Sequence, residues 1–306
     1  MFFLKSIIKS CLTTAFRLFF GISSRVGLIT PCIIIPIDGG ICSQMHQYLL
    51  GEIFRRKGYK VKYSLSFFEK NGKDCDGSQV RNFDLLKAVP YLEFEKATKW
   101  EAKFYSLAFK YIGYYPESLD VKWIELKPPR FLSGYYADPQ GLYRKVYNEV
   151  FRPDANVLDA DNKHLYDTLD ENSVAVHVRR GDLSGYNPAY GYPVTIDYFI
   201  NAVKYMSDKY SSPVFYFFSD DRTYVETQLL PLLPQNICYK LINNGAAKGY
   251  MDLMLISRCR NQIASKGSLG KYGALLDSFP LRTVIVSKDD TQIFMLEEVD
   301  FNLVKL

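Results

Sequence analysis

The stretch Val174-Ala175-Val176-His177-Val178-Arg179-Arg180-Gly181-Asp182 joins a buried type of strand to a charged segment that follows it directly. Its first five residues are apolar, with β-branched positions and one histidine, which is typical of a strand covered on both faces. Ligands of parallel α/β sheets lie beyond the carboxyl ends of such strands. The stretch therefore predicts a parallel sheet that presents polar groups at the end of this strand.

Strand and helix patterns alternate from this point toward the carboxyl end of the chain. Short apolar runs typical of strands occupy residues 213–219, 237–241, 261–264 and 283–286. Helical patterns occupy residues 196–210, 223–230 and 251–260, and a further helix is expected from residue 272. Strands that alternate with helices predict a doubly wound parallel sheet.

A second strand–turn–helix pattern lies in the amino-terminal half. Residues 32–37 are a β-branched strand that ends in Asp38-Gly39-Gly40, and residues 43–56 have helical character. Residues 61–67 alternate like another strand, whereas 70–150 are expected to be mostly helical. A chain of 306 residues exceeds one usual domain. We therefore expect two α/β domains, 29–165 and 166–306, with a cleft between them as the natural place for a site.

Residues 1–28 form a separate basic and apolar segment. Lys5, Lys9 and Arg17 interrupt any run long enough to span a bilayer. On a helical projection the cations and small polar residues share one side, but Phe2, Phe16 and Phe20 fall among them. The pattern predicts an amphipathic helix lying in a membrane interface. The alternatives are a helix packed on the protein's own core and a cleaved signal peptide.

The net charge and the cysteines indicate which ligands and which cellular compartment fit this chain. The net charge of +5 fits an anionic small ligand or an acidic membrane surface, and without clustered basic stripes it gives no case for nucleic acid. The six cysteines are scattered without a CxxC pair, so we expect reduced thiols and no zinc site. No Asn-x-Ser/Thr sequon occurs, which favours a cytoplasmic setting.

Arg179 and Arg180 are the strongest candidates for chemistry. Two adjacent guanidinium groups at a strand end need an anion or a carboxylate, and the planar fork of arginine suits a diphosphate. Asp182 can hold one of them in position. We expect anion binding with stabilisation of charge on a departing nucleotide diphosphate. The alternative is a structural Arg–Asp network with a buried histidine, His177.

Ser219-Asp220-Asp221 also follow a predicted strand. The paired carboxylates are expected to accept hydrogen bonds from a ligand, and one of them caps the next helix. A bound divalent metal is the alternative, which we disfavour because two arginines already supply positive charge. We therefore expect no metal and no cofactor beyond the substrate.

Two glycine-containing turns complete the candidates. The run from Ser265 to Lys271 places serines, glycines and lysines before a helix, a composition that can cradle a phosphate, although its spacing is not that of a P-loop. Gly39-Gly40 also precedes a helix, but a lone Gly-Gly pair is equally typical of a simple strand-to-helix turn.

Several segments carry a family pattern in order along the chain. They are Gly39-Gly40-Ile41-Cys42-Ser43-Gln44-Met45-His46-Gln47-Tyr48, Gly134-Tyr135-Tyr136 with Asp138-Pro139, the HVRRGD of 177–182, Ile196-Asp197-Tyr198, Phe218-Ser219-Asp220-Asp221, and Asp252-Leu253-Met254-Leu255-Ile256-Ser257-Arg258-Cys259 with Ile263-Ala264 and Gly273-Ala274. Together they resemble the α-1,2-fucosyltransferase family (glycosyltransferase family 11), whose members are inverting enzymes that use GDP-fucose.

The resemblance implies a GT-B-like architecture of two Rossmann-like domains, in which the second holds GDP-fucose and the first contributes acceptor binding, without a metal. It assigns the diphosphate to Arg179 and Arg180, with His177 and Asp182 in support. Asp182 is also one candidate for the general base. The other residues that it implies are Ser219, Asp220, Asp221, Asp252, Ser265 and Ser268 for the donor, with Asp220 and Asp221 at the guanosine end, and Gly39, Gly40, Gln44 and Tyr135 for the acceptor or cleft.

The chain departs from the family pattern in two places. Ile41-Cys42-Ser43 stands where the family has Leu-Gly-Asn, and His46 replaces an aromatic residue, which affects acceptor choice. Residues 265–272 differ from the family's tryptophan-containing loop, which affects donor choice. The leading hypothesis is transfer of fucose to a terminal galactose of a lipid-linked surface glycan at the cytoplasmic membrane face. The alternative functions are a glycosyltransferase with a different donor or acceptor and an inactive glycan-binding relative. The alternative location is the cytoplasm, as a soluble protein.

Overall fold

The computed structural model describes residues 2–73, 80–112, 122–136, 138, 141–181, 184–187, 191–276, 279, 281–290, 295–297 and 301–306. The chain forms two compact units. The first contains Met1–Gly39, Ser43–Phe83 and Leu92–Val146, and the second contains Gly40–Cys42, Asp84–Tyr91 and Tyr147–Leu306. The long carboxyl-terminal part of the second unit thus begins at residue 147, whereas the expected boundary lay at residue 165.

The first unit contains a four-stranded parallel sheet in the order β2-β1-β4-β3. Its strands are β1 (Cys32–Pro36), β2 (Lys60–Ser64), β3 (Lys110–Ile112) and β4 (Arg130–Ser133). β1 confirms the first predicted strand. The strand expected over 61–67 ends at Ser64, because the chain turns there into the short helix α3 (Ser66–Lys70).

The expectation of a mostly helical region over 70–150 was wrong, because β3 and β4 lie within it. Strands of three and four residues are too short to show a period of two. This unit also contains the helices α2 (Ile41–Arg56) and α5 (Lys99–Ala108), with a 3-10 turn, η1 (Lys122–Glu125). Thr98 begins α5 with a capping box, in which its side chain and that of Glu101 each bond the other's backbone N–H.

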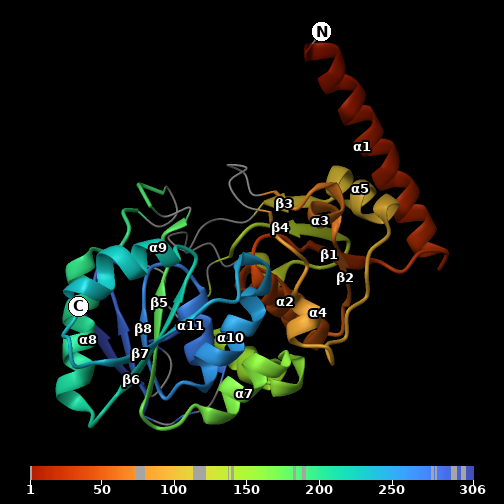
Figure 1. Ribbon diagram of the computed structural model, residues 1–306. Coiled ribbons are helices and arrows are strands. Elements are labelled where there is room, and N and C mark those ends of the chain that lie inside the picture. Colours follow the sequence, from red (N-terminus) through yellow and green to blue (C-terminus); the bar gives the residue numbers. More distant parts are fainter. Residues whose placement is uncertain are drawn as a thin grey trace. The chain divides into compact units, whose positions relative to one another are not determined.

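Helix α1 (Phe2–Arg25) lies beside α5 (Figure 1). It packs there through aromatic side chains. The ring centroid of Phe16 lies 4.9 Å from that of Phe104, and the centroid of Phe20 lies 5.1 Å from that of Phe109. The Nε of Arg17 also donates to the carbonyl of Ala108 at 2.8 Å. Phe16 and Phe20, which interrupt the predicted separation of polar and apolar sides, are therefore residues that fasten this helix to its own unit.

The second unit contains a six-stranded parallel sheet in the order β10-β9-β8-β5-β6-β7. The strands are β5 (Ser173–Val178), β6 (Val214–Ser219), β7 (Cys238–Ile242), β8 (Asn261–Ala264), β9 (Thr283–Val286) and β10 (Asn302–Lys305). From β5, the chain adds β6 and β7 on one side and β8, β9 and β10 on the other. This is the doubly wound order of a Rossmann fold, and it confirms the predicted α/β class with two parallel-sheet units.

Helices cover both faces of the second sheet (Figure 1). One face packs on α8 (Ile196–Lys209) through side chains such as Val176, Phe217 and Phe199. The other face packs on α7 (Ala160–Thr168) and α10 (Gly249–Arg258), with Ala175, Phe218 and Leu255 in the interface. Because side chains alternate along β5, His177 shares the face of Ala175.

Three sequence expectations for this unit need correction. The helix expected from residue 272 begins earlier, as α11 (Leu269–Leu276), because Gly267 at φ 103° completes the preceding turn. The helix expected over 223–230 is α9 (Arg222–Tyr224), followed by a π turn, η4 (Val225–Leu229), and a 3-10 turn, η5 (Leu230–Leu232). The strand at 283–286 is not the last, since β10 follows. The remaining helices are α4 (Leu85–Ala88), α6 (Leu142–Val150), η2 (Ala155–Val157) and η6 (Ala246–Lys248).

Candidate functional site

The predicted donor residues meet at the carboxyl ends of three neighbouring strands in the second unit. β5 leads to Arg179, β6 to Asp220 and β8 to Ser265. β5 is where the strand order reverses, because successive strands are added outward on both of its sides. Doubly wound sheets bind their ligands outside the strand ends at this switch point.

Arg179 is held from both neighbouring strands. Its guanidinium Nη1 lies 2.7 Å from Oδ2 of Asp220, and its backbone N–H donates to Oγ of Ser265 at 2.9 Å. The backbone N–H of Ser265 in turn donates to the carbonyl of His177 at 3.1 Å. The side chain of Arg179 is 20% exposed, so it is fixed in direction while part of it faces solvent.

Arg180 is held differently. Its backbone N–H donates to Oδ1 of Asp220 at 2.8 Å, and its guanidinium carbon lies 4.2 Å from the ring centroid of Tyr224. Among the described residues, no hydrogen-bond partner meets its buried Nε. A cation stacked on an aromatic ring keeps its N–H donors available for an anion. Tyr224 gave no signal in the sequence, because its role depends on a turn after β6.

The two acidic residues after β6 have different roles. Asp220 holds the arginines, as just described, and Oδ1 of Asp221 accepts from the backbone N–H of Tyr224 at 2.9 Å as the N-cap of α9. Ser219 Oγ bridges the two strands by donating to the carbonyl of Val178 at 2.8 Å and accepting from the N–H of Asp221 at 3.0 Å. The carboxylate seen with Arg179 is thus Asp220. Asp182, predicted for that task, lies outside the described residues.

His177 is a buried residue of β5 that packs against the site residues. Its side chain is 5% exposed, and burial, with Arg179 and Lys271 nearby, lowers the pKa of its imidazole to about 3. Nδ1 lies 3.5 Å from Oγ of Ser265. A Cβ added to Gly270 would lie 3.1 Å from the Cβ of His177, so this glycine lets α11 approach the strand closely. A ring that stays neutral at physiological pH beside cations is a packing and orienting group, and a weak base.

The loop between β8 and α11 rests on a buried ion pair. Lys271 Nζ lies 2.7 Å from Oδ2 of Asp290, and both side chains are almost fully buried. Ser268 hydrogen-bonds the thiol of Cys42, whose pKa burial raises to about 12. These contacts set the first turn of α11, whose free backbone N–H groups favour an anion. The sequence identified this loop, but gave no signal for Asp290.

Asp252 lies on the first turn of α10 and faces the end of β7. Asn244, two residues beyond β7, donates to Oδ1 of Asp252 at 2.8 Å. Burial raises the pKa of this carboxyl to about 7, and the hydrogen bond from Asn244 lowers it less. Asn244 was missed in the sequence; its position just after a strand is the signal that could have found it. The pair adds an acidic group at the same edge of the sheet.

The residues predicted for the acceptor lie mostly in the first unit. Gln44 is fully buried and donates to the carbonyls of Gly39 and Asn82 at 3.0 and 2.8 Å, so it fastens the turn before α2. Gly39 takes φ 68°, which favours glycine. Tyr135 is exposed, and its ring centroid lies 5.5 Å from that of His46. Gly40 belongs to the second unit.

His46 fills the place of the aromatic residue in the family pattern. Its ring stacks on Tyr143 with centroids 4.2 Å apart, and burial lowers its pKa to about 4. The imidazole is thus neutral at physiological pH and packs as an aromatic ring does.

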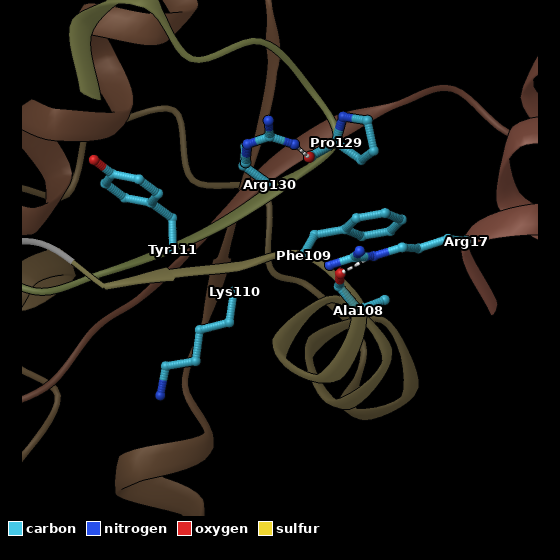
Figure 2. Close-up of a pocket in the computed structure, with 7 residues that line it drawn as sticks. All are labelled: Arg17, Ala108, Phe109, Lys110, Tyr111, Pro129 and Arg130. Carbon is cyan, nitrogen blue, oxygen red and sulfur yellow. Dashed lines mark hydrogen bonds between the residues drawn. The ribbon is translucent and has the colours of Figure 1, made fainter. Parts of the chain in front are cut away.

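A hollow of about 480 Å³ lies elsewhere in the first unit, between α1, β3 and β4 (Figure 2). Arg17, Ala108, Phe109, Lys110, Tyr111, Pro129 and Arg130 line it. None of these residues belongs to the predicted site. In the part of the chain that the structure describes, no three His, Cys, Asp or Glu side chains are grouped so as to hold a metal ion.

Comparison with known proteins agrees with the resemblance in the sequence. The model of glycosyl transferase family 11 matches residues 104–301. The O-antigen biosynthesis glycosyltransferase WbnK of Escherichia coli is 25% identical over 283 residues, which cover 81% of this chain and 91% of WbnK. An alpha-1,2-colitosyltransferase of Escherichia coli is 29% identical over 147 residues, 47% of this chain and 49% of that protein.

Solved structures with similar shape include a glycosyl transferase family 9 protein of Veillonella parvula, with a TM-score of 0.46, 9% identity and coverage of 90% and 87% of the two chains. Fucosyltransferase NodZ from Bradyrhizobium gives a TM-score of 0.44 and 14% identity over 81% of this chain and 92% of NodZ. The family model covers well over half of the sequence and includes Arg179, Arg180, Asp220 and the 265–271 loop. The protein belongs to glycosyl transferase family 11.

Proposed function

We propose that this glycosyltransferase is an inverting α-1,2-fucosyltransferase that transfers fucose from GDP-fucose to the 2-OH of a galactoside in a surface glycan. The observation that carries the proposal is the pair Arg179 and Arg180 at the switch point of the second sheet. Asp220 pairs with the guanidinium of Arg179 and bonds the backbone of Arg180, whose guanidinium stacks on Tyr224. Planar guanidinium groups in this setting match the oxygens of a diphosphate.

The proposed reaction is a single displacement. The acceptor 2-hydroxyl oxygen attacks C1 of fucose, the bond from C1 to the β-phosphate oxygen breaks, and GDP leaves with the electron pair. Arg179, Arg180 and the backbone N–H groups at the start of α11 stabilise the charge that develops on the diphosphate. The hydroxyl proton passes to a general base, for which Asp182 remains our candidate. His177, with a pKa near 3, is too weak for this task.

Asp252 fits the nucleoside end of the donor. An ionised carboxylate accepts hydrogen bonds from the N–H groups of a guanine edge or from ribose hydroxyls. Its neighbour Asn244 orients it by donating to one oxygen. In this proposal Asp220 acts through the arginines, and Asp252 takes over at the guanosine end, where Asp220 and Asp221 had been expected.

A different donor is the second candidate, and two observations favour it. One similar protein is named as a colitosyltransferase, which points to another sugar with the same α-1,2 linkage. The 265–271 loop also carries Lys266, Lys271 and two glycines where the family pattern has bulky aromatic residues. A rebuilt loop beside the diphosphate alters the space left for the sugar.

We further propose that α1 holds the enzyme on the cytoplasmic face of a membrane. Its aliphatic and aromatic side chains Ile7, Ile8, Leu12, Leu18, Phe19 and Ile22 are all exposed. They form a stripe along the helix, beside the side on which Phe16 and Phe20 pack on the first unit. An exposed apolar stripe next to cations is typical of an interfacial helix. No helix among the described residues has the length and hydropathy needed to cross a bilayer.

Donor turnover in EDTA tests the proposed function. Purified protein is incubated with a β-galactoside and with GDP-fucose, GDP-mannose or UDP-galactose in turn, and GDP or UDP release and the product linkage are measured. Transfer of fucose under chelation supports the proposal and its metal-free chemistry. Turnover of another donor, with none from GDP-fucose, selects the second candidate. Loss of all turnover in EDTA, with recovery on adding Mg²⁺ or Mn²⁺, contradicts the metal-free role of the arginines.

A further inference from the structure

Two exposed tyrosines stand close together on the segment that follows the arginines. Tyr186 is 66% exposed and Tyr192 is 70% exposed, and their ring centroids lie 5.3 Å apart at an interplanar angle of 63°. Contiguous exposed apolar surface can mark a site where a ligand or partner binds. Tyrosine offers a broad apolar face and a hydroxyl that can hydrogen-bond, which suits a ligand with both apolar and polar edges.

The segment that carries the pair is held by backbone hydrogen bonds. Asn187 and Gly191 exchange two backbone hydrogen bonds of 2.9 and 2.7 Å, which bring their neighbours Tyr186 and Tyr192 close together. Gly191 takes φ 70°, which favours glycine at this position. The two rings therefore flank a pair of backbone hydrogen bonds.

A buried lysine connects Tyr192 to the donor loop. Lys266 is 9% exposed, and its Nζ donates to the carbonyl of Tyr192 at 2.7 Å. The next residue, Gly267, lies against Arg179, since a Cβ added to it would be 3.7 Å from Cγ of that arginine. The tyrosine pair is thus joined by one side chain to the loop that packs on the proposed diphosphate site.

We propose that Tyr186 and Tyr192 form a sugar-binding platform for the glycan acceptor. A pyranose ring has an apolar face of C–H groups and an equatorial rim of hydroxyls, and the two tyrosines provide aromatic surface and hydroxyls of matching kind. The platform places an acceptor subsite on the second unit, beside the donor loop and separate from the predicted acceptor residues of the first unit. The inference rests on the proposed transfer to a glycan, and its test separates the two.

Glycan binding is measured by saturation-transfer NMR with N-acetyllactosamine in the presence of saturating GDP, on wild type and on Tyr186→Ala, Tyr192→Ala and the double variant. Both single variants should weaken binding several-fold and the double variant at least tenfold, while Tyr192→Phe retains most of it. Trp100→Ala, which removes an exposed aromatic residue of the first unit, is the matched control and should leave binding unchanged. GDP affinity, measured by calorimetry, should be the same in all of them.

Equal glycan binding by the wild type and the double variant would overturn the platform, even if fucose transfer occurs. A fall in GDP affinity together with glycan binding would also overturn it, because the tyrosines would then be structural supports of the donor loop. If wild type binds GDP but no galactoside, both the platform as proposed and the galactoside acceptor are wrong, and the donor part of the proposed function still stands. With an active donor, the variants should raise KM for the acceptor and leave kcat nearly unchanged.

Discussion

At the scale of single residues, the site is built from charged side chains that specific neighbours hold in place. Asp220 uses both carboxylate oxygens, one for the guanidinium of Arg179 and one for the backbone of Arg180. Tyr224 then orients the second guanidinium by stacking. Adjacent guanidinium groups repel one another, so such partners offset their repulsion, and a bound dianion would stabilise the arrangement further.

Asp252 gives a prediction about pH at this scale. Its pKa of about 7 in the folded chain exceeds the ordinary 3.8, so its ionisation opposes folding. Stability that Asp252 contributes below pH 4 is therefore lost as the pH rises through 7. Asp252→Asn stays neutral and should unfold at a temperature a few degrees higher than wild type at pH 8, with little difference at pH 4.5. Thermal unfolding followed by circular dichroism measures both.

The same variant should bind GDP more weakly, since the proposed acceptor of guanosine hydrogen bonds is gone. In wild type, GDP affinity should rise between pH 6 and pH 8 as Asp252 ionises. The variant should not show this rise. Asp167→Asn is a suitable control, because Asp167 is exposed and pairs with Lys163 on the surface of α7. Equal unfolding temperatures at pH 8, or unchanged GDP affinity, would count against the buried, donor-facing role of Asp252.

At the scale of elements, α1 combines packed aromatic residues with exposed apolar ones. Phe16 and Phe20 fasten it to the unit, and the neighbouring stripe that includes Leu18 and Phe19 is exposed. Burying a large apolar side chain contributes about 1.5–3 kcal/mol. The exposed stripe can therefore contribute substantially to membrane affinity without loosening the fold.

Leu18→Gln with Phe19→Gln should lower partitioning onto phosphatidylglycerol vesicles at least tenfold, because both side chains lose burial in the interface. GDP affinity should not change. Ser10→Gln, at an exposed polar position of the same helix, should partition as wild type does. Co-sedimentation with vesicles measures the effect, and equal sedimentation of the double variant and wild type would refute the membrane role of α1.

The sequence predicted elements best where they are long and apolar. β5 and the segment after it were recognisable because a mostly apolar run, 174–178, precedes two arginines. β3, β4 and β10 were missed because three or four residues at a sheet edge or beside prolines show no period. Site residues were recoverable where they follow such a strand, as Asp220 does. Tyr224 and Asp290 were not, since their roles arise from turns and tertiary pairing that no local pattern encodes.

At the scale of the whole molecule, the doubly wound second unit explains why the site lies where it does. The strand order brings the ends of β5, β6 and β8 together, although Arg179, Asp220 and Ser265 are far apart in sequence. The order also places α11 so that its first turn faces the same edge. Membership of glycosyl transferase family 11 gives this architecture its chemical context.

The central claim is that Arg179 binds the donor's diphosphate, and calorimetry with GDP and guanosine tests it most directly. In wild type, GDP should bind much more tightly than guanosine. Arg179→Ala should reduce this difference by about 10- to 100-fold, the range for a lost charge-assisted hydrogen bond, with guanosine affinity and thermal stability nearly unchanged. Arg222→Ala, whose arginine pairs with Glu226 on the surface, should behave as wild type. If Arg179→Ala weakens both ligands equally, or neither, the claim is wrong.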